Sequence, residues 1–435
     1  MTSLSSPTIR RELTIEDKLR ILTEGAKYDV SCSSSGSARQ GKKNSLGDCS
    51  YGGICHSFTP DGRCVSLLKI LMSNHCLYNC KYCINRREED VERATLTPRE
   101  LCEITVGFYR RNYIEGLFLS SAVFASPDET MARLTETVMM LRTEYRFRGY
   151  IHLKAIPGCS PEWLDLAAQY ADRMSENIEL PSSEGLKMLA PQKTKDSILS
   201  PMKHLATLSA RALEQRGRSR ILPAGQTTQM IIGATPDADG KILHLSEGLY
   251  RNFAMKRVYY SAYVPVGNPS LLPVKPPDLL RENRLYQADW LLRFYGFRAE
   301  ELLSPNENLD PTVDPKSHWA LRHPECFPLE INTAPYEMIL RVPGIGVKSA
   351  WKIVQARKIA TLRYEDLQKM KVVLRRAAHF ITCNGKYYGC GENPSVVKSH
   401  LLSPAFAQKD SYQISLTDAA LLLSETKQSA LSGQL

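Results

Sequence analysis

The chain has 435 residues, 43% of them hydrophobic, and a formal charge of +10 at neutral pH. This length and composition exclude a wholly disordered chain and leave room for roughly two or three domains. No apolar run approaches the roughly 20 residues of a membrane-spanning helix, and the N-terminus lacks an apolar signal-peptide core. We therefore expect a cytoplasmic protein with no membrane partner. In that compartment the 12 cysteines favour metal binding or redox chemistry over disulfides.

The first predicted element is an amphipathic helix over 15–22, which carries Leu19 and Leu22 on one face. A Ser- and Gly-rich loop over 31–53 follows. Strands then alternate with helices. The predicted strands are 65–72, 117–119, 150–154, 173–180, 227–232 and 258–263, and the predicted helices are 97–112, 128–144, 161–170 and 200–215. This alternation indicates an α/β fold with an incomplete (β/α)6 barrel, in which chemistry takes place at the carboxyl ends of the strands.

A different composition marks the C-terminal part of the chain. A proline-rich joint leads to a helix over 285–297, and residues 326–400 then hold 12 Lys or Arg against 5 Asp or Glu. The basic stretch predicts a small all-α module. The expected domains are 1–64 (N-terminal helix and cysteine-containing loops), 65–265 (barrel), 266–325 (joint and helical connector), 326–390 (basic module) and 391–435 (tail).

Three cysteines follow the first predicted barrel strand. Cys76, Cys80 and Cys83 give the spacing C-x3-C-x2-C. Three thiolates can hold one face of an iron–sulfur cube and leave the fourth iron open to a small molecule. A structural zinc site is the alternative, but it normally has four protein ligands. The pattern therefore favours a 4Fe-4S cluster.

This triplet resembles the signature of the radical S-adenosylmethionine (SAM) superfamily, C-x3-C-x-aromatic-C, with Tyr82 at the aromatic position. The resemblance implies that SAM binds the open iron through its amino and carboxylate groups. It also implies an electron donor such as flavodoxin or ferredoxin. Reductive cleavage of SAM would give methionine and a 5′-deoxyadenosyl radical, which abstracts hydrogen from a substrate C–H bond.

The same resemblance implies SAM contacts at later strand ends. Ser120 and Ser121 stand where the superfamily commonly has Gly-Gly-Glu, and can accept hydrogen bonds from the SAM amine; an ordinary strand-end turn is the alternative. Lys154 can meet the SAM carboxylate or form a structural ion pair. Asn177 and Glu179, two apart on a predicted strand, would share one face near the SAM ribose.

Segment 230–233 resembles the strand that packs the SAM adenine, with Ile231 in contact with the ring. Strings at 27–29, 53–56, 61–64, 113–121 and 178–181 extend the resemblance over about residues 15–385. Over this span the chain is similar to a radical SAM subgroup assigned to DNA modification or repair. Gene linkage associates that subgroup with a uracil-DNA glycosylase-like protein, which is thereby an implied partner. Ala122 departs from the Gly expected in this subgroup.

Three earlier cysteines form a weaker pattern. Cys32, Cys55 and Cys64 lie in loops upstream of the triplet, at wide spacing. They can ligate an auxiliary iron–sulfur cluster or a zinc ion, or they can be free thiols beside the first cluster.

Residues 332–350 predict a short helix, a tight Pro-Gly-Ile-Gly turn and a second helix. This resembles the helix-hairpin-helix motif of DNA-binding proteins. Gly344 and Gly346 would let backbone N–H groups approach a phosphate, while Lys348 and Lys352 add positive charge. The alternative is a helical hairpin that only stabilises the barrel.

Together these features predict a radical SAM enzyme that modifies or repairs nucleic acid, with DNA preferred. One alternative is a radical SAM enzyme that modifies RNA or tRNA. The other is a DNA-binding protein whose iron–sulfur cluster is structural or senses redox state.

Overall fold

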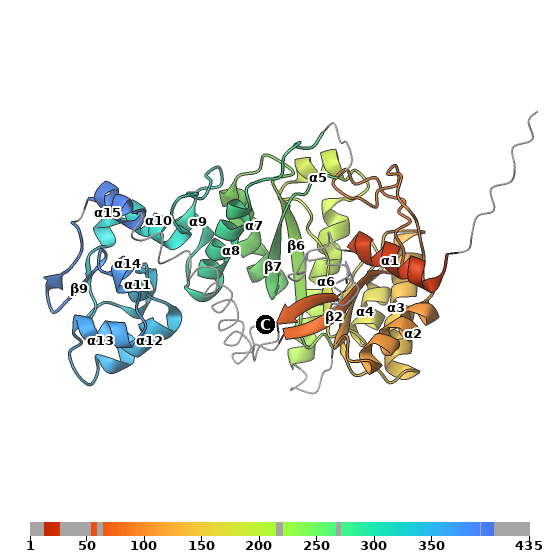
Figure 1. Ribbon diagram of the computed structural model, residues 1–435, viewed down its shortest axis with the longest axis horizontal. Helices are drawn as coiled ribbons and strands as arrows, with labels where there is room; N and C mark the ends of the chain where they lie inside the picture. Colours follow the sequence, from red (N-terminus) through yellow and green to blue (C-terminus); the bar gives the residue numbers. More distant parts are fainter. Residues whose placement is uncertain are drawn as a thin grey trace, which may run out of the picture. The chain divides into compact units, whose positions relative to one another are not determined.

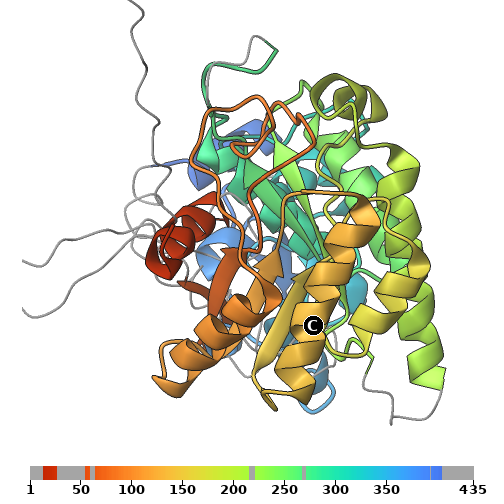
Figure 2. The ribbon, with the colours of Figure 1, turned by 90° about the vertical axis from the view of Figure 1, so that its right-hand side faces the viewer.

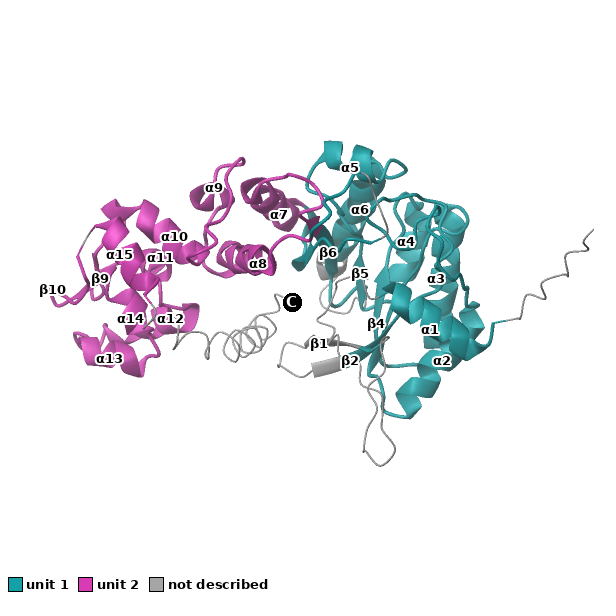
Figure 3. Cartoon of the chain, turned by 45° about the horizontal axis from the view of Figure 1, so that its top comes forward, with its two compact units in different colours: residues 1–230, 253–275, 426–435 teal, residues 231–252, 276–425 magenta. Residues whose placement is uncertain are grey.

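The structure is a computed structural model that describes residues 13–26, 54–58, 64–214, 221–266, 271–391 and 393–403. The chain divides into two compact units, coloured separately in Figure 3. Unit 1 comprises 1–230, 253–275 and 426–435, and unit 2 comprises 231–252 and 276–425. Among the described residues, no helix combines the length and the apolar character needed to cross a membrane.

Unit 1 is built on a seven-stranded sheet whose strands follow one another in sequence order (Figure 1). The strands are β1 (Ile54–Phe58), β2 (Cys64–Leu71), β3 (Gly116–Ser120), β4 (Tyr150–Lys154), β5 (Arg173–Ser175), β6 (Gln226–Ile232) and β7 (Arg257–Ala262). Strands β2 to β6 pair in parallel, for example Leu68 with Leu117, and β7 lies next to β6. The six strands from β2 to β7 confirm the predicted partial barrel.

Helices cover one face of this sheet (Figure 2). They are α1 (Ile15–Ala26), α2 (Pro98–Arg110), α3 (Pro127–Thr143), α4 (Pro161–Ala168) and α6 (Lys195–Glu214). The short helix α5 (Ser183–Leu189) precedes α6 and contributes no residue to this core. Helices α2 and α3 start as their sequences indicate: Thr97 and Ser126 accept from backbone N–H groups of the first turn, and a proline follows each of them. Buried strand residues such as Leu119 and Leu153 pack with helix residues such as Leu134 in one core.

Two parts of the barrel differ from the prediction. The strand expected over 173–180 ends at Ser175, and Glu179 has φ +64°, outside the extended region, so no strand continues through 179–180. Glu179 keeps only an isolated parallel bridge to Met230. Strand β1 was not predicted; it pairs antiparallel with β2 and covers an edge that would otherwise be open.

Unit 2 is mostly helical. Its helices are α7 (Asp239–Phe253), α8 (Leu279–Phe294), α9 (Ala299–Leu302), α10 (Pro315–Arg322), α11 (Tyr336–Arg341), α12 (Val347–Ala356), α13 (Tyr364–Lys369), α14 (Leu374–Ala377) and α15 (Pro394–Leu401), with a 3-10 turn at Pro324–Cys326. Three short strands, β8 (Leu329–Glu330), β9 (Ile381–Cys383) and β10 (Lys386–Tyr387), form a second sheet. The all-α prediction therefore missed this sheet, whose strands are too short to show a period in the sequence.

Aromatic and charged contacts hold unit 2 together. Trp319 is 5% exposed and meets Phe297 edge to face at 5.4 Å between ring centroids. Arg341 of α11 pairs with Glu301 at 2.8 Å, which ties α11 to α9. Asp314 caps α10 and lies 3.5 Å from Arg376 of α14.

Candidate functional site

The cysteine triplet lies in the loop between β2 and α2. Cys80 is buried, Cys76 and Cys83 are half-buried, and all three are unpaired thiols. Burial, with smaller effects from Cys80 and Cys76, raises the pKa of Cys83 to about 12. Within the described residues, however, no three His, Cys, Asp or Glu side chains already have a metal-binding arrangement. The loop supplies three thiols of the kind that hold an iron–sulfur cluster, and they bind it in their deprotonated form.

Arg93 closes this loop. One terminal nitrogen, Nη1, donates to the carbonyl oxygens of Asn74 (2.6 Å) and Asn85 (2.9 Å). The other, Nη2, donates to those of Arg86 and Glu89, both at 2.7 Å. The four carbonyls lie on both sides of the cysteines in sequence, so one planar guanidinium fixes the path of the loop. Sequence reasoning missed Arg93, because an isolated arginine in a polar loop is typical of a surface residue.

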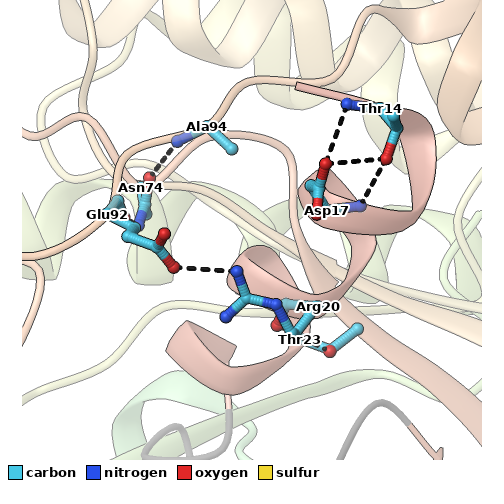
Figure 4. A network of polar contacts seen from close by, with 7 residues as sticks. All are labelled: Thr14, Asp17, Arg20, Thr23, Asn74, Glu92 and Ala94. Carbon is cyan, nitrogen blue, oxygen red and sulfur yellow. Dashed lines mark hydrogen bonds and ion pairs between the residues drawn. The ribbon is translucent and has the colours of Figure 1, made fainter. Parts of the chain in front are cut away.

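Asn74 fixes the point where the loop leaves β2 (Figure 4). Its amide nitrogen donates to the carbonyl of Glu92 at 2.7 Å, and its amide oxygen accepts from the N–H of Ala94 at 2.8 Å. The Glu92 carboxylate pairs with Arg20 of α1 at 2.8 Å. Asn74 is buried, whereas this ion pair is exposed and contributes little stability.

The connector between α5 and α6 holds the middle of the cysteine loop. Lys81 N–H donates to the carbonyl of Leu189 at 2.7 Å, and Asn79 N–H donates to Gln192 Oε1 at 3.2 Å. Lys193 follows, and its Nζ pairs with Glu179 Oε1 at 2.7 Å; the two side chains are 12% and 8% exposed. The connector thus links the cysteine loop to the end of the fourth barrel strand.

Lys193 places a positive charge beside the cysteine loop. Burial acts against that charge, but Glu179, Tyr82 and Cys80 together raise the pKa of Lys193 well above its usual value. Burial raises the pKa of Cys80, and Lys193 opposes that increase. Sequence reasoning missed Lys193, whose partner Glu179 lies on another element.

Ser120 and Ser121 lie next to the cysteine loop. Met72 N–H donates to the carbonyl of Ser120 and Leu77 N–H to that of Val123, both at 2.8 Å. Ser120 is buried, and its Oγ has no hydrogen-bond partner in the described part of the chain. Ser121 Oγ donates to the carbonyl of Ala122 at 2.7 Å. Of the two serines, Ser120 therefore has the side chain that is available to a ligand.

The remaining predicted SAM residues lie at or after the ends of later strands. Lys154 is the half-buried last residue of β4, and Ile231 is half-buried on β6. Asn177 and Glu179 are both buried, but they follow β5 instead of lying on it. The expectation that they share one face of a strand is wrong, because the positive φ of Glu179 breaks the alternation. Glu179 Oε1 is also occupied by Lys193.

Several buried polar atoms of the barrel lack a hydrogen-bond partner among the described residues. Besides Ser120 Oγ they include Thr227 Oγ1 and Gln229 Oε1 on β6 and the Tyr263 hydroxyl just after β7. Buried polar groups normally have partners, so these atoms indicate a polar ligand or water. Three unpaired thiols with such atoms nearby in the fold fit a cluster that binds a small polar molecule.

The auxiliary-site cysteines remain a prediction. Cys32 lies outside the described residues. Cys55 on β1 pairs with Leu67, and Cys64 on β2 pairs with Phe58. These two residue pairs are three positions apart along the antiparallel β1–β2 pairing. At the usual rise per residue, the backbone positions of Cys55 and Cys64 are therefore separated by roughly 10 Å along the strands.

In unit 2 the segment of the predicted hairpin forms α11, a tight turn and α12, and its identity as a DNA-binding motif stays a prediction. Gly344 has φ +85°, and a Cβ there would lie 2.6 Å from the Val373 carbonyl oxygen, so the turn requires glycine. Gly346 is the N-cap of α12 and offers no side-chain cap. Among the described residues the N–H groups of Gly344 and Gly346 have no partner, and Lys348 and Lys352 are exposed.

No protein-family model matches the sequence, and no curated protein matches it. Among solved structures, the FeFe-hydrogenase maturase HydG from Carboxydothermus hydrogenoformans is 16% identical with a TM-score of 0.39, over 51% of this chain and 50% of that chain. A radical SAM methyltransferase from Sphaerobacter thermophilus is 14% identical with a TM-score of 0.38, over 54% and 65%. The cobalamin-dependent S-adenosylmethionine radical enzyme OxsB is 13% identical with a TM-score of 0.32, over 84% and 58%. The chain spans less than two thirds of each, and all three likenesses are distant.

Proposed function

We propose that the protein is a radical SAM enzyme that modifies or repairs nucleic acid, with DNA as its substrate. One observation carries the proposal: the C-x3-C-x2-C loop follows the first parallel strand of a half-barrel and contacts the end of the second. In this arrangement Cys76, Cys80 and Cys83 hold a 4Fe-4S cluster. The bound cluster supplies the electron that cleaves SAM reductively.

The chain's own residues have distinct tasks in this proposal. Ser120 Oγ, buried and without a partner among the described residues, accepts a hydrogen bond from the SAM amine. Lys193 offsets the negative charge of the thiolates, and its pair with Glu179 keeps it at the loop. Lys154, Asn177 and Ile231 remain proposed contacts for the carboxylate, ribose and adenine.

Nucleic-acid binding is the task that we assign to the hairpin of unit 2. Two features support it: the uncapped N-terminus of α12 with its open N–H groups, and the excess of Lys and Arg over residues 326–400. Backbone N–H groups at a helix N-terminus suit a phosphate, and such contacts carry no sequence information. A base in a duplex must leave the stack to reach a barrel interior. A flavodoxin- or ferredoxin-like electron donor and a uracil-DNA glycosylase-like protein are the proposed protein partners.

Anaerobic reconstitution with iron and sulfide, followed by dithionite and SAM, tests the enzyme class. We expect about four irons per chain and formation of 5′-deoxyadenosine, which increases when DNA is added. Cys80→Ala should lose both the cluster and the product, whereas Cys102→Ala, a buried cysteine of α2, should keep both. A reconstituted protein that makes no 5′-deoxyadenosine with DNA or RNA would instead be a structural or redox-sensing iron–sulfur protein.

The substrate is tested with site-deuterated oligonucleotides. Deuterium found in 5′-deoxyadenosine by mass spectrometry identifies the position from which hydrogen is taken. Transfer from deuterated DNA, and none from structured RNA at matched salt, is the expected result. Deuterium transfer from RNA and none from DNA would show that RNA, and not DNA, is the substrate.

A further inference from the structure

An exposed tryptophan lies in the middle of the hairpin's second helix. Trp351 of α12 is 59% exposed, and it makes no ring contact with the described residues. Trp319 of the same unit is 5% exposed and packs against Phe297. Tryptophan is largely buried in most folds, and a solvated indole gives up a large apolar contact area. Packing within the described part of unit 2 therefore gives no reason for a tryptophan at this position.

The residues around Trp351 carry unbalanced positive charge. Lys348 and Lys352 are exposed and lie three residues before and one residue after it, so Lys348 shares a helical face with both Trp351 and Lys352. Neither lysine has an acidic partner in the part of the chain that the structure describes. Residues 338–364 contain no Asp or Glu, and their basic residues are Arg341, Lys348, Lys352, Arg357, Lys358 and Arg363.

Two of these basic residues, Arg341 and Arg357, bond to other groups of unit 2 and are therefore not available to a ligand. Arg341 pairs with Glu301 at 2.8 Å. Arg357 donates to the carbonyls of Ile331 (3.0 Å) and Ala334 (2.6 Å). The exposed positive charge near Trp351 thus comes from lysines, beside a turn with open backbone N–H groups. We call Gly344, Gly346, Lys348, Trp351 and Lys352 the hairpin surface.

We infer that Trp351 is a stacking site for an unpaired nucleobase, so that the hairpin surface binds single-stranded DNA in preference to duplex. The inference rests on the proposed nucleic-acid function and specifies its substrate form. A nucleic-acid strand offers both a flat ring for the indole and phosphates for the lysines and N–H groups. A base inside a duplex is stacked on both faces, so an indole on a convex helix can reach only a base that is unpaired, terminal or extruded.

The test compares single-stranded DNA with a duplex of the same sequence, with the full-length protein at one salt concentration. Fluorescence anisotropy of a labelled oligonucleotide gives both dissociation constants. For Trp351→Ala we expect single-strand binding to weaken about 10-fold or more and duplex binding to change less than about twofold. Trp351→Phe should keep most of the wild-type affinity for single-stranded DNA, because a phenyl ring also stacks. Ile359→Ala, which removes another exposed apolar side chain (89% exposed), should change neither constant.

Several outcomes would overturn the inference. Equal weakening for both DNA forms would make Trp351 a general contact, and no weakening would make it irrelevant to binding. A loss that Trp351→Phe does not recover would exclude stacking. The proposed function is tested separately, by Lys348→Ala with Lys352→Ala, which should weaken both forms and reduce their salt dependence. If the wild-type protein binds neither form, nucleic-acid binding by unit 2 fails and the stacking site fails with it.

Discussion

The cysteine loop of unit 1 is a long connection between β2 and α2, whereas the hairpin turn of unit 2 is short, and the two present different groups to a ligand: side chains in the first and backbone N–H groups in the second. Side chains hold the cysteine loop, because Arg93 and Asn74 bond to its backbone groups. The hairpin turn is held by two backbone bonds, Ile345 N–H to the carbonyl of Val342 at 3.2 Å and Val373 N–H to that of Gly344 at 2.9 Å. It is also held by the buried Lys316, whose Nζ donates to the carbonyl of Ile345 at 2.6 Å. A loop that presents side chains to a ligand can have its backbone groups bonded within the protein. A turn that presents backbone N–H groups to a ligand must keep them without an internal partner, and here the backbone conformation of that turn requires glycine.

Removing Arg93 should have the largest effect on the cysteine loop. Arg93→Met leaves four carbonyls without their charged donor, and we expect a loss of about 5 kcal/mol in the free energy of unfolding of unit 1. Iron content after reconstitution should fall below about a tenth of the wild-type value. Thermal unfolding and iron analysis provide the measurements. Arg87→Met, an exposed arginine of the same loop, is the control and should retain the cluster. Equal iron in both variants would contradict the role of Arg93.

Lys193→Met should have the next largest effect, because it leaves Glu179 charged, buried and unpaired. We expect a loss of about 3 kcal/mol in unfolding free energy. The double variant with Glu179→Leu should recover most of that stability, since no buried charge remains. Lys193→Met alone should also lower the midpoint potential of the cluster in an EPR-monitored redox titration, because it removes a positive charge beside the thiolates. An unchanged potential in Lys193→Met would leave Lys193 with a structural role only.

Gly344→Ala tests whether the hairpin turn depends on glycine, and it should have the third largest effect. A methyl group at φ +85° that faces the Val373 carbonyl should cost about 2 kcal/mol, measured by urea unfolding. Gly248→Ala in α7 is the control, since its Cβ would meet nothing within 4 Å and alanine favours the helix. A neutral Gly344→Ala would show that the turn does not depend on glycine.

The smallest expected effect is that of Asp314, whose side chain caps α10 and lies 3.5 Å from Arg376 of α14. Burial opposes its ionised form, but Arg376 and hydrogen bonds from Ser317 outweigh burial and lower the pKa of Asp314. A lowered pKa stabilises the fold above the ordinary value near 3.9, and this stabilisation is lost as the pH falls through the folded-state value. Asp314→Asn should therefore cost about 1 kcal/mol at pH 7.

Urea midpoints at pH 7 and in acid measure this contribution. The difference between wild type and Asp314→Asn should shrink toward zero in acid, where Asp314 is protonated in both folded and unfolded chains. Glu337→Gln, which changes an exposed acid of α11, is the control and should leave the midpoint unchanged at both pH values. A difference that persists in acid would contradict an electrostatic role for Asp314.

The parts of the fold that sequence reasoning predicted are those whose signals are local. The apolar runs of β2 and β4, the Thr97 cap of α2 and the cysteine spacing each lie within about ten residues. The missed contacts join residues that are distant in sequence, such as Lys193 with Glu179, and a charged residue alone does not reveal its partner. The positive φ at Glu179 was also hidden, because this conformation favours Gly or Asn in sequence statistics.

Arg93 has a consequence for the order of assembly. Its four bonds join protein groups to one another, whereas the fold of a small zinc domain depends on bonds from the chain to the metal. Synthesis and iron delivery can therefore be separate events for this chain. A molecule that loses its cluster to oxygen should keep a folded receptor loop, and it can be loaded again without being unfolded.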